Sequence, residues 1–124
     1  MNRYLLTVAL PTWNRSGFLK ELLAQLCEDV AASGLTDQVE ILVSNNCSAD
    51  DTEVVVEHFR ARHSFVSYNK NSSNIGAKSN VLRSMELASG EYVMFLGDDD
   101  RIRSGALKDI TRLLASRPDT GVLI

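Results

Sequence analysis

The sequence predicts one α/β domain over residues 1–124, a three-layer α/β/α arrangement with a mostly parallel sheet. Two observations lead to this fold class. Short, nearly continuous apolar runs, typical of strands covered on both faces, alternate with segments whose apolar residues recur every three or four positions, as in amphipathic helices. The chain also has no internal repeat, low-complexity tract or linker that would divide it into several domains.

The first strand and the first helix are expected near the start of the chain. Residues 4–10 form an apolar run that ends at Pro11, and the helical pattern begins near Gly17. Ser33 and Gly34 supply a stop signal for this helix. Its apolar face is expected to carry Phe18, Leu19, Leu22, Leu23, Leu26 and Val30.

Two more strands and a second helix follow. Residues 39–44 are apolar and rich in β-branched side chains, and residues 65–68 form a weaker strand. Between them, Ser48 and Asp51 have the spacing of a capping box in which Asp replaces the usual Glu, and the helix is expected to run to about Arg62.

A polar loop, a third helix and a fourth strand come next. Residues 69–76 are dense in turn-forming residues and are predicted to be a loop. The helix is expected over residues 77–88, with Gly90 as its left-handed stop, and the strand over residues 91–96. One side of the helix would carry Val81, Leu82, Met85 and either Leu87 or Ala88.

The last predicted elements are a helix and a strand. Ser104 is the expected cap of the helix, which would end before Pro118, and residues 121–124 begin a fifth strand. An open sheet edge at this strand would expose unpaired backbone groups and would promote formation of oligomers.

The composition excludes several classes of function. The formal net charge is -3 at pH 7 and Lys and Arg are scattered, which disfavours a nucleic-acid partner. Cys27 and Cys47 form neither a disulfide framework nor a zinc-ligand spacing, so a reducing, cytoplasmic setting is expected. No run approaches the roughly 20 apolar residues of a membrane span, and the apolar run at the start ends at Pro11 without a signal-peptide cleavage site.

Polar segments follow each of the first four predicted strands. These segments are residues 11–15, 44–48, 69–78 and 97–100. The carboxyl ends of parallel strands lie at one edge of a sheet, where ligands bind in such folds. The segments would therefore bring amide side chains, two cationic side chains and an acidic cluster together, a mixture that suits a ligand with a phosphate and a nucleobase, bridged to the acids by a cation.

The acidic cluster consists of Asp98, Asp99 and Asp100. Like charges a few ångströms apart repel by roughly 1 kcal/mol in water and by more near a protein surface, so the cluster favours raised pKa values or a bound cation. Mg²⁺ or Mn²⁺ would take oxygen ligands from one or two of these carboxylates and from substrate phosphates. A solvated turn, or a favourable interaction with the dipole of the next helix, is the alternative interpretation.

Structural interpretations also exist for the other three segments. The pair Asn45 and Asn46 has the composition of a turn and helix cap. Trp13 would pack on the core in a helix-entry segment, and Lys78 would be a solvated helix residue. Each segment alone is therefore ambiguous, and the functional interpretation depends on the four of them together.

Taken together, the four segments resemble the nucleotide-sugar-binding, N-terminal half of family 2 glycosyltransferases, which have the GT-A fold. The matching stretches are PTWNR at residues 11–15, VSNNCSADDT at 43–52, NIG at 74–76 with Asn80 and GEY at 90–92, and GDDD at 97–100. The resemblance covers essentially the whole chain. Two positions depart from the family pattern, because Asn45 and Asn46 replace an acidic pair and Gly97 stands where a D-x-D motif begins.

The resemblance implies a set of site residues. The nucleotide sugar would be bound by Pro11, Thr12, Asn14, Arg15, Asn46, Lys78 and Asp98, and the metal by Asp99 and Asp98. In this set Asn46 would recognise the base, Lys78 would lie near the diphosphate, and Asp99 is the first choice as metal ligand.

The resemblance also implies a function. The chain would be the donor-binding part of a metal-dependent, inverting glycosyltransferase that uses Mg²⁺ or Mn²⁺ and transfers a sugar from a nucleoside diphosphate sugar to a polysaccharide, lipid or protein glycan. The half that holds the acceptor and the general base is expected to be absent from these 124 residues. The enzyme would be cytoplasmic or peripheral to the membrane.

Other functions remain as alternatives. The main one is a non-catalytic or truncated nucleotide-binding module, which the missing general base favours. A phosphoacceptor receiver domain would need an acidic pair after the first strand, where Thr12 and Trp13 stand instead. A nucleotidyltransferase would share the metal and diphosphate chemistry, but no Gly-rich phosphate loop follows the first strand.

Overall fold

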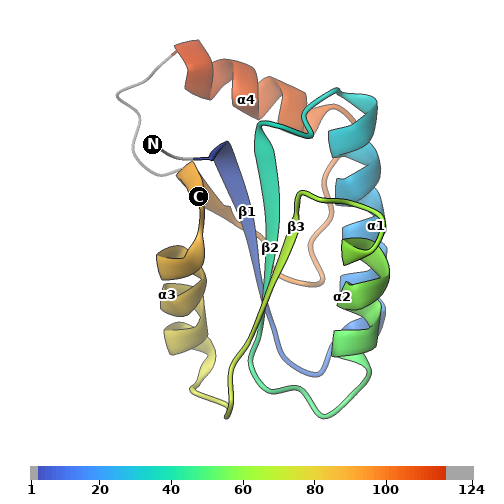
Figure 1. The fold of residues 1–124 in the computed structure, drawn as a ribbon, viewed down its shortest axis with the longest axis vertical. Coiled ribbons are helices and arrows are strands. Elements are labelled where there is room, and N and C mark those ends of the chain that lie inside the picture. The colour runs from blue at the N-terminus through green and yellow to red at the C-terminus, as the bar shows by residue number, and fades with distance from the viewer. Residues whose placement is uncertain (1–2, 117–124) are drawn as a thin grey trace.

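Four strands form one parallel sheet in the computed structural model, which describes residues 3–116 (Figure 1). The strands are β1 (Tyr4–Thr12), β2 (Val39–Asn45), β3 (Val66–Lys70) and β4 (Gly90–Phe95), and their order in the sheet is β3-β2-β1-β4. All three neighbouring pairs are parallel. This arrangement confirms the predicted fold class, whereas the fifth strand expected at residues 121–124 lies outside the described residues.

Helices cover both faces of the sheet. Helices α1 (Ser16–Ala32) and α2 (Thr52–Arg60) lie on one face and α3 (Ala77–Leu87) on the other, while α4 (Ala106–Ser116) packs beside α1 near the amino ends of the strands (Figure 1). The helices occur where the periodicity predicts them, although α2 ends two residues before Arg62. None of the helices in residues 3–116 has the length and apolar character that a membrane span requires.

The apolar core lies between the sheet and α1. Alternate residues of a strand point to opposite faces, so one set of β1 and β2 side chains faces α1. That set consists of Leu6, Val8, Leu10, Val39, Ile41 and Val43, all fully buried. The helix contributes Leu19, Leu22, Leu23, Leu26 and Val30, which are also fully buried, as the sequence predicts. Phe18, expected on the same apolar face, is instead 52% exposed.

The opposite face of the sheet is also covered, as expected, but it buries polar side chains beside apolar ones such as Ala9 and Leu42. Glu40 lies in the middle of β2 and is only 3% exposed. Its carboxylate accepts hydrogen bonds from Thr7 Oγ1 at 2.8 Å, Ser67 Oγ at 2.7 Å and the Ser89 backbone N–H at 2.9 Å. The strands β1, β2 and β3 and the start of β4 are thus joined by one buried carboxylate.

Helix α3 is correspondingly inverted relative to its prediction. Its buried residues are the polar Asn80 and Ser84, whereas Leu82, Met85 and Leu87 are exposed. Asn80 explains this orientation, because its amide accepts from Ser44 Oγ at 2.8 Å and donates to the Ser44 carbonyl at 2.9 Å. A polar sheet face selects the polar side of the helix that covers it.

Two predicted helix caps are replaced by other contacts. At the start of α2, Ser48 Oγ accepts from the N–H of Asn14 rather than from its own helix, and Asp51 makes no side-chain cap. The N–H of Thr52 donates instead to Asp50 Oδ1 at 3.1 Å. Neither contact belongs to the capping box that was expected between Ser48 and Asp51. The local sequence pattern therefore predicted where the helix starts but not which residue caps it.

At the start of α4, a residue of another helix takes the place of the predicted cap. The carboxylate of Asp29, on α1, accepts from the N–H groups of Gly105 at 2.7 Å and Leu107 at 3.3 Å. Ser104 was expected in this role. Asp29 is 76 residues away from Gly105 in sequence, so this contact could not be found from local spacing.

Glycine is required at two chain reversals for different reasons. Gly34 has φ +69 after α1, as the predicted stop signal requires. Gly90 does not adopt the left-handed conformation expected for it. A Cβ atom at Gly90 would lie 2.5 Å from the Thr7 backbone nitrogen, so glycine is needed there because β4 begins in close contact with β1.

Glu40→Ala is expected to destabilise the fold strongly. The substitution leaves two hydroxyl groups and one backbone N–H without their acceptor in a buried place, which costs about 2–4 kcal/mol in the free energy of unfolding. Glu40→Gln keeps the shape and most of the hydrogen bonds, so its effect should be smaller. Urea unfolding measures both, with Glu91→Ala, at an exposed glutamate, as the control. Equal effects of Glu40→Ala and Glu91→Ala would contradict the role assigned to Glu40.

Candidate functional site

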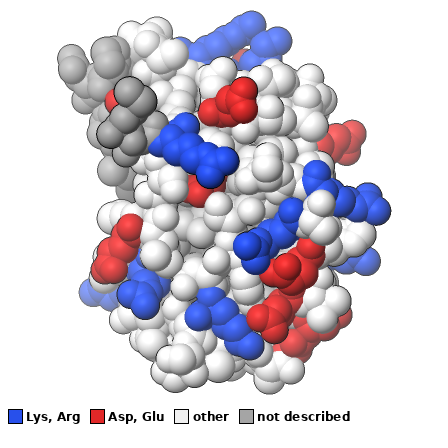
Figure 2. Space-filling view, viewed as in Figure 1, with Lys and Arg blue, Asp and Glu red and all other residues white. Residues whose placement is uncertain are grey.

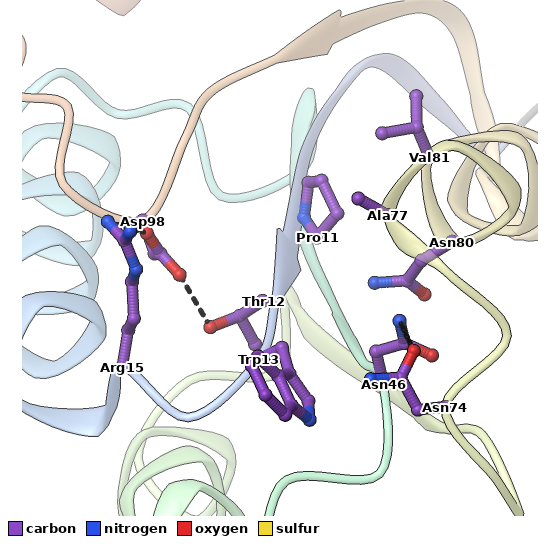
Figure 3. A pocket seen from close by; sticks show the side chains of 10 residues that line it. All are labelled: Pro11, Thr12, Trp13, Arg15, Asn46, Asn74, Ala77, Asn80, Val81 and Asp98. Atoms are coloured by element: carbon purple, nitrogen blue, oxygen red, sulfur yellow. Dashed lines mark hydrogen bonds and ion pairs between the residues drawn. The ribbon is translucent and has the colours of Figure 1, made fainter.

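A cavity of about 260 Å³ opens at the carboxyl ends of the strands, beside β1 (Figure 3). The chain order of the strands reverses between β1 and β4, and ligands of open parallel sheets bind beyond the strand ends at such a point. The predicted site residues that line the cavity are Pro11, Thr12, Arg15, Asn46 and Asp98. The structure therefore brings five of the eight predicted site residues together at one cavity.

Thr12 lies between the two sides of the cavity (Figure 3). Strand β1 extends two residues beyond its predicted end, so Pro11 and Thr12 belong to the sheet and pair with Ser44 and Asn45 of β2. The Thr12 carbonyl accepts from the N–H of Asn46 at 2.9 Å, and its hydroxyl donates to Asp98 Oδ2 at 2.9 Å. Thr12 is thus hydrogen-bonded both to the segment after β2 and to the segment after β4, which lie on opposite sides of β1.

Asp98 and Arg15 form one wall of the cavity (Figure 3). Asp98 is only 7% exposed, and Arg15 Nη1 lies 3.7 Å from its Oδ1 and 3.5 Å from Oδ2 of the exposed Asp99. Burial raises the pKa of the Asp98 carboxyl, and the Asp99 charge adds to this, whereas the Thr12 hydrogen bond and the Arg15 charge lower it. The wall therefore holds a carboxylate whose charge is poorly solvated.

The three consecutive aspartates have three different environments. Asp98 points into the cavity, Asp99 lies at the surface beside Arg15, and Asp100 turns back, because its Oδ2 accepts from the N–H of Gly97 at 2.7 Å. Asp100 is therefore a turn residue, which agrees with the alternative interpretation of this aspartate cluster as a solvated turn. Within residues 3–116 no three His, Cys, Asp or Glu side chains are grouped so that they could hold a metal ion.

Asn46 lies on the opposite wall, together with Asn74 and Asn80 (Figure 3). It is 3% exposed, and its side-chain amide bonds only to residues 71–76 of the loop before α3. Asn74 and Asn80 were quoted in the sequence motif but were not named as site residues. Their place in the cavity follows from the fold of this loop onto the end of β2.

Besides Asp99, two predicted residues do not line the cavity, namely Asn14 and Lys78. Asn14, with φ +53, links the loops after β1 and β2, since its N–H donates to Ser48 Oγ at 2.9 Å and its Oδ1 accepts from the Ala49 N–H at 2.7 Å. It lines a neighbouring hollow of about 440 Å³ that also includes Arg15. Lys78 is exposed on the first turn of α3 and does not line the cavity. A role in donor binding stays a prediction for both.

Three further residues line the cavity and were not predicted as site residues. Trp13 is 51% exposed, so it does not pack in the core as the alternative interpretation required. The others are Ala77 and Val81, from the first turns of α3. Trp13 could have been predicted as a site residue, because it is an aromatic residue in the polar segment that follows the first strand. No local feature of the sequence marks Ala77 or Val81 as site residues.

The described surface carries mixed charge. On the face drawn in Figure 2, basic and acidic side chains are interspersed over the described residues, without a continuous basic stripe. Several charged side chains of the described residues form exposed ion pairs, such as Lys70 with Glu53 and Arg60 with Glu57. A phosphate backbone would thus meet no extended positive field on this face.

Comparison with known proteins agrees with the fold and with the predicted family. The family model "Glycosyl transferase family 2" matches residues 7–124. Abequosyltransferase RfbV of Salmonella typhimurium is 33% identical over 116 residues, which are 93% of this chain and 34% of that protein. The chain thus spans about a third of the length of this relative.

Two solved structures share the fold. TarS residues 1–349 of S. aureus, in complex with UDP-GlcNAc, superposes with a TM-score of 0.80 at 26% identity, over 92% of this chain and 32% of that one. The mannosyltransferase PcManGT from Pyrobaculum calidifontis, in complex with GDP-Man and Mn²⁺, gives a TM-score of 0.77 at 22% identity, over 91% and 33%. The predicted family and the predicted fold are both confirmed.

Asp98→Asn is expected to raise the unfolding temperature at pH 7. Because folding raises the pKa of Asp98, the ionised carboxylate opposes folding, and this cost is absent below the ordinary carboxyl pKa and grows as the pH rises through the raised pKa. The asparagine cannot ionise but can still accept from Thr12 Oγ1. Thermal unfolding of both proteins from pH 7 down through the acid range measures the difference, which should shrink as the pH falls. A variant that is less stable at pH 7 would contradict this.

Proposed function

The chain belongs to glycosyl transferase family 2, and we propose that its cavity binds the nucleoside diphosphate part of a sugar donor. The observation that carries the proposal is the joint position of Thr12, Arg15 and Asp98 in one cavity at the end of β1. A guanidinium group is a good partner for phosphate oxygens, and a carboxylate is a good partner for ribose hydroxyls or a metal ion. The complex of TarS with UDP-GlcNAc supports a donor of this class.

The remaining predicted residues take places around this donor in the proposal. Pro11 and Thr12 line the cavity at the end of β1, and Trp13 offers an exposed ring on which a nucleobase can stack. Asn14 and Lys78 lie outside the cavity and would contribute from its margins, with Lys78 on the diphosphate side. The cavity is lined by both polar and apolar residues, as a site for a nucleotide requires.

Asp98 and Asp99 fit a divalent ion. Mg²⁺ and Mn²⁺ prefer oxygen ligands and are commonly held by one or two carboxylates together with substrate phosphates. The two carboxylates already share one cationic group, because Arg15 Nη1 lies within 4 Å of both. When bound, the ion would supply positive charge to the departing nucleoside diphosphate.

The proposed reaction is an inverting transfer of the sugar. In such a displacement a general base removes the proton of the acceptor hydroxyl while the nucleoside diphosphate leaves. In the proposal Asp98 and Asp99 serve the donor side, and other residues of the enzyme act as the general base and form the acceptor site. The acceptor is a polysaccharide, a lipid or a protein glycan, and both free cysteines fit a cytoplasmic enzyme or one peripheral to the membrane.

A non-catalytic nucleotide-binding module is the second candidate. It is favoured by one observation, namely that among residues 3–116 no other carboxylate lines the cavity and could act as general base once Asp98 binds the donor. Both candidates require nucleotide binding. They differ in transfer, which the module would not perform with any acceptor.

Asp99→Ala is expected to weaken donor binding by about tenfold or more, because one carboxylate ligand of the metal ion that would bridge this site to the diphosphate is lost. Calorimetric titration of UDP, GDP and their sugars into the chain, with Mn²⁺ and with a chelator, measures this effect. Asp37→Ala, at another exposed aspartate far from the cavity, is the matched control. Binding that depends neither on the metal nor on Asp99 would remove the metal from the proposal, and absence of binding by the wild type would remove the donor site itself.

A further inference from the structure

The side-chain amide of Asn46 has no hydrogen-bonding position left for a ligand. A carboxamide offers two N–H donors and two acceptor lone pairs. The Nδ2 group donates to Asn74 Oδ1 at 2.9 Å and to the Gly76 carbonyl at 3.2 Å. Oδ1 accepts from Asn71 Nδ2 at 3.0 Å and from the Ile75 N–H at 2.9 Å. The residue expected to recognise the nucleobase is therefore fully engaged by its own chain.

The orientation of this amide is set by its backbone partners. The Ile75 N–H can only donate, so it must face the oxygen of Asn46, and the Gly76 carbonyl can only accept, so it must face the nitrogen. Turning the amide over would place two donors together and two acceptors together. The four contacts thus form one consistent set.

The same contacts continue into the sheet and into α3. Asn71 Nδ2 also donates to Asn80 Oδ1 at 2.9 Å, and Asn80 is bonded to both the hydroxyl and the carbonyl of Ser44 in β2. On the other side, Asn74 Oδ1 accepts from the N–H of Gly76, which has φ +92 and precedes α3. The amide of Asn46 is the link between these two parts, and it fixes the loop at residues 71–76 against the end of β2.

We propose that Asn46 is a positioning residue, which holds this loop and the start of α3 as one wall of the donor cavity and does not read the nucleobase itself. The inference rests on the proposed function, since it concerns how the donor cavity is held. The proposal also gives a physical reason why asparagine stands at position 46, where the family pattern has an acidic residue. A carboxylate at residue 46 would have no N–H to offer, and its oxygens would face Asn74 Oδ1 and the Gly76 carbonyl with repulsion.

Asn46→Asp tests the proposal with the smallest possible change. The substitution keeps the shape and the acceptor contacts and removes both donor contacts, so the loop should open more often. Without ligand, hydrogen exchange at the N–H groups of Ile75 and Gly76 should become about tenfold faster or more. The affinities for UDP and for GDP should fall together, by about tenfold each, with their ratio unchanged.

Asn45→Asp is the matched control. Asn45 is the preceding residue, is 1% exposed, and donates from Nδ2 to Tyr68 Oη at 3.0 Å, but its side chain does not bond to the loop. The Tyr68 hydroxyl can reverse and donate to a carboxylate. Exchange at Ile75 and Gly76 should therefore match the wild type in this variant.

The outcomes separate positioning from recognition and from simple stability. A changed ratio of UDP to GDP affinity with unchanged loop exchange would overturn the proposal, since it would mean that Asn46 reads the base. A lower unfolding temperature with unaltered affinity of the folded protein would also overturn it, since it would leave Asn46 a stabilising role only. Loss of affinity for both nucleotides together with fast loop exchange supports it.

Two further arms keep the test decisive. If Asn46→Asp does not fold, the wild type is measured instead, and fast exchange at Ile75, which is 42% exposed, would overturn the proposal. Asn74→Ala, at an exposed position, removes one partner of the amide and should also speed exchange at the Ile75 N–H, which donates to Asn46 and not to Asn74. The exchange measurements need no nucleotide. Slow exchange in a wild type that binds no nucleotide would therefore defeat the proposed function while leaving the loop contact established.

Discussion

The site depends on the two hydrogen bonds of Thr12. Its hydroxyl donates a hydrogen bond to Asp98 after β4, and its carbonyl accepts one from the N–H of Asn46 after β2. One residue of β1 therefore contacts both walls of the cavity. This is possible because β1 continues through Pro11 to Thr12 and stays paired with β2 up to Asn45.

The two faces of the sheet have separate tasks. The face toward α1 is apolar and fully buried, and it supplies the hydrophobic stabilisation of the domain. The face toward α3 carries directional contacts instead, from Glu40 in the middle of β2 to Ser44 and Asn80 near its end. Hydrogen bonds fix distance and orientation more closely than apolar contacts do. The polar face is therefore the one suited to place the cavity wall.

The sequence was sufficient for features that depend on local pattern. The period of the apolar residues located the strands and helices, and the rule for strand ends brought Thr12 and Asp98 to one cavity. It failed where a partner is distant in the chain. Asp29 caps α4, Glu40 joins strands, and α3 turns its polar side inward, and each follows from contacts between residues far apart. Composition alone gave no signal for these.

The arrangement of the aspartates follows from the cost of placing like charges together. The Asp100 carboxylate turns away from the cavity to accept a hydrogen bond from the Gly97 N–H, and the Asp99 carboxylate is exposed to water. Of the three aspartates, only Asp98 is buried. Its charge is met by the Thr12 hydroxyl and by Arg15, which it shares with Asp99. Burial still outweighs these partners in setting its pKa, so the site retains unmet attraction for a cation. A carboxylate placed there for stability alone would be better replaced by an amide, and this is the physical reason for which the proposed function assigns Asp98 to a ligand.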